Sequence, residues 1–357
     1  MRVRNIKNRL WNAKIGLLVA AGLLLLVAPV SGRAQKSPTP ADLLVQKGEQ
    51  VLDLGDLASA AQNFDAARKL APENKAAWGG LLLTALQARR PVDAIAVGEQ
   101  AVKRWPQDAE FHHRLGVAYF QNKQHDLAAE QLAQAEKLAP GEFEIHFDFA
   151  LVYLDQGQYA PAAEELQKAV RLKPDVPLAH LLLGRAFVNT NRTLLAVEQI
   201  QTALRLDPKI PLGHYHLGFA YFSLGRNSEA IAEYKRELAS GQENIEVIYR
   251  LGEALLDSGQ FAEAEKYLRQ VVDRNPRYSD AQYDFGKALL ALGQTAAAIE
   301  ALNLAVAINP NDERPHYQLA RALEASGDKA GATRELAVFA ELKKHQPATG
   351  GMASKPK

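Results

Sequence analysis

The sequence predicts an all-α fold, an α-solenoid of antiparallel helix pairs built from a repeat of 34 residues. Two recurring residue types predict it. Alanine occupies one place in every repeat, at positions 60, 94, 128, 162, 196, 230, 264, 298 and 332. Proline recurs with the same period, at positions 72, 106, 140, 174, 208, 276 and 310. A fixed period of this length is typical of repeat architectures, in which each unit packs only against its neighbours.

Each repeat contains two stretches with the apolar spacing of a helix. A residue that tolerates the left-handed backbone of a helix end separates them, namely Gly55, Gly157, Asn191, Gly225, Gly259, Gly293 or Gly327. The proline stops the second helix, because proline does not fit a helix interior. A glycine or alanine of the first helix faces the recurring alanine of the second, so we expect close helix packing. Leu82 breaks this rule and predicts a local distortion in the second repeat.

The N-terminus differs from the repeats. Five basic residues within the first 14 precede an apolar run of 14 residues, 15–28. This run is shorter than the roughly 20 residues that a membrane-spanning helix needs. Small residues follow, up to Ala34, so the pattern predicts a secretory signal peptide over 1–34 that is cleaved after Ala34. An uncleaved N-terminal membrane anchor is the alternative.

The rest of the chain divides simply. Residues 35–40 are predicted to be a flexible linker, 41–346 hold nine repeats, and 347–357 form a disordered tail. The absence of cysteine excludes thiolate catalysis, cysteine-ligated metal sites and a lipoprotein anchor. Beyond residue 34 the chain has 36 basic and 41 acidic residues, and this mildly acidic balance argues against nucleic acid as a partner.

The repeat resembles the tetratricopeptide repeat, whose signature is W-x2-L-G-x2-Y followed by A, F, A and P. The third repeat carries this signature as Leu115, Gly116, Tyr119, Ala128, Ala135 and Pro140, and the sixth as Leu217, Gly218, Tyr221, Ala230 and Tyr234. The resemblance implies a right-handed superhelix whose first helices line a concave groove that binds proteins or extended peptides. Trp78 alone fills the tryptophan place, and Ser240, Gly241 and Gln242 stand where the sixth repeat should have proline. The second departure predicts altered stacking between repeats six and seven.

Five histidines share the fourth place of their repeats: His112, His146, His180, His214 and His316. A metal or haem ladder is one interpretation of this row. Equivalent places in successive repeats lie about 8–10 Å apart, whereas zinc needs each nitrogen at about 2 Å. We therefore expect packing histidines, with no metal site and no cofactor.

Motifs of catalysis and nucleotide binding are missing from the sequence, including GxSxG, GxxxxGK[ST] and HExxH. Paired carboxylates occur at helix-surface spacing beside lysines, which favours solvated faces with local ion pairs. The chain is therefore predicted not to be an enzyme and to have no small-molecule substrate.

A second apolar stripe on the first helices is the predicted partner-binding groove. It is rich in aromatic residues, which suit peptide capture because they offer large contact area with little lost rotamer freedom. The predicted groove residues are Phe120, Phe147, Leu151, Tyr215, Phe219, Phe222, Tyr249, Tyr283 and Tyr317. The alternative is that neighbouring repeats bury these rings. Toward the C-terminus the stripe becomes charged, with Glu253, Lys287, Arg321 and Glu324, so the partner should present a polar portion there.

These observations predict an exported, non-enzymatic protein–protein interaction scaffold of the cell envelope, periplasmic or secreted, that binds an extended or helical protein segment. The alternative is a structural component of a secretion or polysaccharide assembly, held in the inner membrane by an uncleaved N-terminus. Membrane contact is expected only through that segment.

Overall fold

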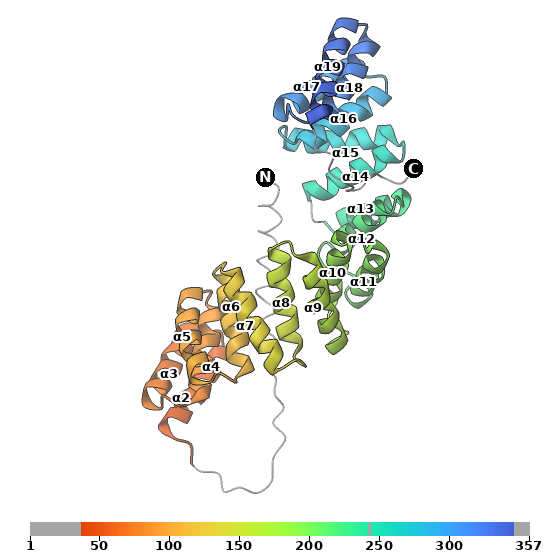
Figure 1. The fold of residues 1–357 in the computed structure, drawn as a ribbon. Helices are drawn as coiled ribbons and strands as arrows, with labels where there is room; N and C mark the ends of the chain where they lie inside the picture. The colour runs from red at the N-terminus through yellow and green to blue at the C-terminus, as the bar shows by residue number, and fades with distance from the viewer. Residues whose placement is uncertain (1–36, 242–243, 346–357) are drawn as a thin grey trace. The chain divides into compact units, whose positions relative to one another are not determined.

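The computed structural model describes residues 37–241 and 244–345, and within these ranges all regular structure is α-helical (Figure 1). The chain forms two compact units, Met1–Pro174 and Asp175–Lys357. The predicted signal peptide and the predicted tail lie outside the described residues. None of the described helices is both long enough and apolar enough to span a membrane.

The helices of the first unit are α2 (Pro40–Asp53), α3 (Leu57–Leu70), α4 (Lys75–Gln87), α5 (Pro91–Arg104), α6 (Ala109–Gln121), α7 (His125–Leu138), α8 (Phe143–Asp155) and α9 (Tyr159–Leu172). Those of the second unit are α10 (Pro177–Asn189), α11 (Thr193–Leu206), α12 (Gly213–Ser223), α13 (Asn227–Ala239), α14 (Ile245–Asp257), α15 (Phe261–Arg274), α16 (Ser279–Ala291), α17 (Thr295–Ile308), α18 (Glu313–Ser326) and α19 (Lys329–His345).

Consecutive helices pack as pairs, α2 on α3, α4 on α5 and so on to α18 on α19. Each pair is joined by a turn too short for anything but an antiparallel return. In the first unit the even-numbered helices α4, α6 and α8 begin at Lys75, Ala109 and Phe143, at intervals of the 34-residue period. The predicted all-α fold of stacked helix pairs is therefore confirmed.

The turn inside the pair has the predicted left-handed residue in all seven repeats for which a glycine or asparagine was expected. Its φ is +80° at Gly55, +76° at Gly259 and +58° at Asn191. Arg89 and Lys123 adopt the same conformation in repeats two and three, with φ of +54° and +63°, although a side chain is strained there. The need to reverse the chain thus outweighs the local preference of these two residues.

The predicted close packing within pairs is also present. Eight of the nine recurring alanines are completely buried, and the ninth, Ala332, is 6% exposed. Opposite them the first helix carries glycine: a Cβ built on Gly184 would lie 3.1 Å from the carbonyl oxygen of Ala196 and 2.4 Å from Ile200. Glycine at this place therefore lets the large side chain of the second helix enter the pair.

The second repeat meets the same demand differently. Its helices keep the lengths of the others, 13 and 14 residues, although Leu82 stands at the glycine place and is fully buried. The ring of Phe64 fits instead between Gly48 and Gly80, where built Cβ atoms would lie 2.8 and 2.4 Å from it. The expected distortion is thus a redistribution of small residues, with the helices intact.

One boundary differs from the predicted one, and one helix starts later than its equivalents in the other repeats. Thr39 caps α2 in a reciprocal capping box with Asp42, and Pro40 is its first residue, so the end of the predicted linker is ordered as a helix start. α12 starts late, at Gly213 after a left-handed Leu212. The carboxylate of Glu237 in α13 accepts hydrogen bonds from the backbone N–H groups of Leu212 and Tyr215, both 3.1 Å long, and so supplies the missing cap. Gln242, where altered stacking was predicted, lies outside the described residues.

Candidate functional site

The first helices form the inner face of each unit. Within the first unit α2 contacts α4, α4 contacts α6 and α6 contacts α8, and within the second α10, α12, α14, α16 and α18 contact one another in the same way. Among the described residues, successive second helices have no comparable contact. Each unit therefore curves with its first helices on the inside.

The fifth place of the repeat holds the aromatic ladder of the predicted groove, and the structure places much of it inside the stack. Tyr215 is 8% exposed and Tyr249 is 5% exposed. The hydroxyl of Tyr249 donates to Asp284 Oδ2 at 3.0 Å, and Tyr215 hydrogen bonds to Arg250. Both partners belong to the following repeat, so these rings link successive repeats. For them, the alternative in which neighbouring repeats bury the ring describes the structure.

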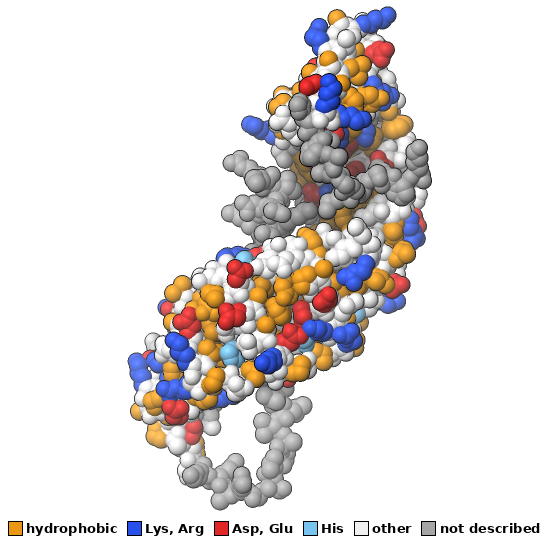
Figure 2. All heavy atoms as spheres, in the orientation of Figure 1, with side chains coloured by type: hydrophobic (Ala, Val, Ile, Leu, Met, Phe, Trp, Pro, Cys, Tyr) orange, Lys and Arg blue, Asp and Glu red, His pale blue; other side chains and the backbone are white. Residues whose placement is uncertain are grey.

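The nine predicted groove residues thus divide by exposure. Phe147, Leu151, Tyr215 and Tyr249 are buried. Phe120, Phe219, Phe222 and Tyr283 are half-buried, and Tyr317 is 42% exposed. The surface that a partner can touch without rearrangement is therefore made by the second group. In the face visible in Figure 2, acidic, basic and apolar side chains are interspersed, with no large field of one sign.

An aromatic–cation cluster lies at repeats six and seven. The guanidinium of Arg250 sits over the ring of Phe219, 5.6 Å from its centre. Arg250 also pairs with Glu246 at 3.1 Å and with Glu253 at 2.8 Å. Burial works against the charged form, but these two carboxylates raise the pKa of Arg250 above its ordinary value. The side chain is therefore a permanent, oriented cation beside an accessible ring.

A buried carboxyl group lies in the next repeat. Burial raises the pKa of Asp284 to about 6, against the opposing effect of Lys287, whose ammonium lies 3.4 Å away. Burial also raises the pKa of the Tyr249 hydroxyl, so this group keeps its proton at neutral pH and donates a hydrogen bond to Asp284. Tyr249 and Asp284 therefore form a polar link between repeats seven and eight. The role of Asp284 was not predicted from the sequence, because Asp284 lies one repeat away from the tyrosine that it binds.

The recurring histidines are structural ties. Their Nδ1 atoms lie within hydrogen-bond distance of a glutamine or glutamate oxygen of the second helix in the same repeat, at 2.6–2.8 Å: Gln131, Glu165, Gln199, Glu233 and Glu335. Three Nε2 atoms face the carbonyl oxygen of the preceding proline, in His112, His146 and His316. Trp78 and Gln282, at the same place, also donate to the carbonyls of Pro72 and Pro276. The fourth place thus connects five of the proline turns to the helix pair that follows.

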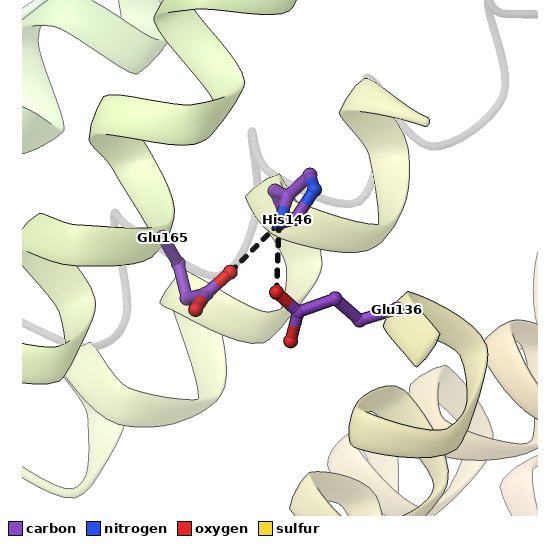
Figure 3. A group of neighbouring side chains, drawn as sticks. All are labelled: Glu136, His146 and Glu165. Carbon is purple, nitrogen blue, oxygen red and sulfur yellow. Dashed lines mark hydrogen bonds and ion pairs between the residues drawn. The ribbon is translucent and has the colours of Figure 1, made fainter. Parts of the chain in front are cut away.

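One of these histidines has two acidic neighbours. The Nδ1 atom of His146 lies 2.7 Å from Glu165 and 3.8 Å from Glu136, which belongs to the preceding repeat (Figure 3). The ammonium of Lys168 binds both carboxylates, at 2.6 and 2.8 Å. A metal ion would have to displace this ammonium and break the histidine hydrogen bond. Lys168 supplies the positive charge that the carboxylates need, so the group is explained as an ion-pair network.

Comparison with known proteins agrees with this architecture. Two family profiles described as tetratricopeptide repeat match the chain, one at residues 85–146, 221–283 and 255–319 and the other at 46–109, 147–209 and 182–245. Among curated proteins, none matches significantly.

Solved structures with similar folds include three tetratricopeptide-like chains. A chain of the APC/C hetero-tetramer Cut9–Hcn1 superposes with a TM-score of 0.53 and 21% identity, over 80% of this chain and 56% of that one. YrrB, reported as a TPR protein with an unusual peptide-binding site, gives 0.46 and 21%, over 52% and 95%. A tetratricopeptide repeat protein from Parabacteroides merdae gives 0.49 and 15%, over 70% and 98%. This chain therefore spans just over half of the first of these relatives, and that likeness concerns the fold alone. With profile matches that together run from residue 46 to 319, the chain belongs to the tetratricopeptide repeat family.

Proposed function

We propose that the chain is an exported, non-enzymatic scaffold that binds an extended or helical segment of a partner protein along the inner faces of its first helices. Tetratricopeptide repeats are protein–protein interaction modules, and this general role follows from membership of the family. Three points go beyond this general role and belong to the proposal: binding at the inner face of the first helices, the residues that make the contact, and export from the cytoplasm.

The observation that carries the proposal is the Phe219–Arg250 pair. Aromatic residues and arginine are enriched at the centres of protein interfaces, where a rigid ring and a fixed cation give contact area and direction at low entropic cost. Here Glu246 and Glu253 hold Arg250 in place before any partner arrives. Phe222 extends the accessible apolar surface by one helical turn on α12. The site is therefore preorganised, as tight peptide binding requires.

The test is the double substitution Phe219→Ala and Phe222→Ala in the full chain. Both rings are half-buried on the inner face, so the variant should keep its helical circular dichroism and lose at least tenfold in affinity for partners recovered from the cell envelope. Leu304→Ala is the matched control, because Leu304 is 49% exposed on the second helix α17. Equal binding by the double variant and the control would refute the groove.

Export is supported by the basic segment, the 14-residue apolar run and the small residues up to Ala34. Mass spectrometry of the exported protein should find Gln35 at the N-terminus. Retention of Met1 in a membrane fraction would instead support the anchored structural component.

A further inference from the structure

A contact across the first helices links successive repeats at five junctions. There the residue at the fifth place of one repeat hydrogen bonds to the residue at the sixth place of the next, 35 residues later. The pairs are Gly79 with Arg114, His113 with Asp148, Tyr215 with Arg250, Tyr249 with Asp284 and Tyr283 with Gln318. These pairs show which partner the fifth-place residue of a repeat finds in the repeat stacked on it.

Among the described residues, no repeat stacks on the ninth. Tyr317 holds its fifth place and is 42% exposed, whereas Tyr249 is 5% exposed at the same place. Leu336, on the second helix α19, is 44% exposed, whereas Leu302 at the equivalent place is completely buried. Arg321, at the ninth place, is also exposed. Terminal repeats of solenoids usually have a polar outer face, so this apolar end is unlike a cap.

The first repeat is open on the opposite side. Gln46, at its sixth place, is exposed, and so is Glu49 at its ninth place. Leu43, on the same helix α2, is 52% exposed. This surface faces where a preceding repeat would stack.

We propose that the ninth repeat of one molecule stacks on the first repeat of a second copy, so that the 34-residue register continues from one molecule into the next. Tyr317 then meets Gln46 of the second copy as Tyr283 meets Gln318 within the chain. Asp42 of the second copy brings a carboxylate to the second place, the place where Asp280 and Arg314 of repeats eight and nine form an ion pair of 2.8 Å.

Charge and apolar surface fit this register as well. Arg321 and Glu49 have opposite charges at the ninth place of the two end repeats, and Leu336 and Leu43 supply the exposed apolar side chains. The two surfaces differ, so the contact is head-to-tail and adds copies in a line.

The test uses two variants of the full chain with one damaged surface each. Leu43→Asp blocks the first repeat and Leu336→Asp blocks the ninth, and both positions are exposed, so folding should be retained and is checked by circular dichroism. In sedimentation velocity, the weight-average mass of the unaltered chain should at least double between about 1 and 100 µM. Each variant alone should stay monomeric, and an equimolar mixture should form dimers and nothing larger.

The charges provide an independent check. Arg321→Glu or Glu49→Lys alone should weaken association about tenfold, and the chain that carries both should recover it. A monomeric unaltered chain at every concentration would overturn the proposal. So would self-association of the Leu43→Asp variant, because it would mean a symmetric contact between two ninth repeats.

Discussion

Tyr249 and Asp284 are joined by a 3.0 Å hydrogen bond between two buried side chains of adjacent repeats. The bond shows what the fifth-place tyrosines do in the middle of the second unit: they hold one first helix against the next. A ring that is buried between two repeats is not accessible to a partner protein. The rings beside it that remain half-buried, such as Phe219 and Phe222, are the ones that the proposed function assigns to partner binding.

Asp284→Asn should stabilise the protein at neutral pH. The pKa of Asp284 is about 6 in the folded chain against an ordinary value of 3.8, so the folded state holds this proton more tightly than the unfolded state. The free energy of unfolding contributed by this group is therefore highest below pH 4 and falls as the pH rises through 6. An asparagine cannot ionise, and its amide oxygen can still accept from Tyr249. We expect a gain of at most about 3 kcal/mol at pH 7.5 and none at pH 4.

Urea unfolding of both proteins at the two pH values measures this difference. The variant's advantage must shrink toward acidic pH, because only the aspartate takes up a proton there. A variant that is less stable than the unaltered chain at pH 7.5 would show that the ionised carboxylate, paired with Lys287, is the stabilising form.

Gly184→Ala should destabilise the fifth repeat. The added Cβ would lie 2.4 Å from Ile200 Cγ1 and 3.1 Å from the carbonyl oxygen of Ala196, so the helix pair must spread. Overpacking of this kind costs about 1–3 kcal/mol. Combining it with Ile200→Ala should give less than the sum of the two single effects, because the clash is gone. Thermal unfolding of all four proteins gives the coupling, and strict additivity would contradict the predicted contact.

Gly259→Ala tests the left-handed turn between α14 and α15. Its φ is +76° and no atom lies within 4 Å of a built Cβ, so any cost comes from the backbone alone. We expect a loss of about 1–2 kcal/mol. Gly141→Ala is the matched control, since its surroundings are equally open and its φ is not in the left-handed region. Equal unfolding temperatures for the two variants would disprove the argument.

His146→Gln should be tolerated better than His146→Leu. A glutamine already holds this place in the eighth repeat, where Gln282 donates to the carbonyl of Pro276 at 3.0 Å, so Gln can keep the tie to Pro140. Leucine removes both hydrogen bonds, and the buried carboxylate of Glu165 then has one hydrogen-bonding partner fewer. We expect losses of about 1 kcal/mol for glutamine and 2–3 kcal/mol for leucine in chemical denaturation. A reversed order would mean that packing volume, and not hydrogen bonding, decides this position.

The fold could be predicted almost completely from the sequence, because the same pattern of residues recurs in every 34-residue repeat. Alanine, glycine and proline each have a steric reason to occupy their places, and nine copies reinforce one another. Where one repeat departs, the compensation is not visible in that repeat alone. Gly80 makes room for Phe64 of the preceding repeat, and Glu237 caps a helix 22 residues before it.

The groove could be predicted only in part. Helical spacing shows that Tyr215 and Phe219 lie on one side of α12, but it does not show how close the next repeat comes. The missing information was in the partners, since Arg250 and Asp284 at the sixth place offer polar atoms to the preceding tyrosines. A pairing of fifth and sixth places at a spacing of 35 residues was the available signal.

The central claim is that partners bind the inner face beside Arg250, and site-specific photo-crosslinking tests it most directly. A photoreactive phenylalanine analogue placed at Phe219, and separately at Leu304 on α17, reports which face a partner touches in intact cell envelopes. The proposal predicts discrete protein adducts from position 219 and none from position 304. Adducts from position 304 with none from 219 would contradict it.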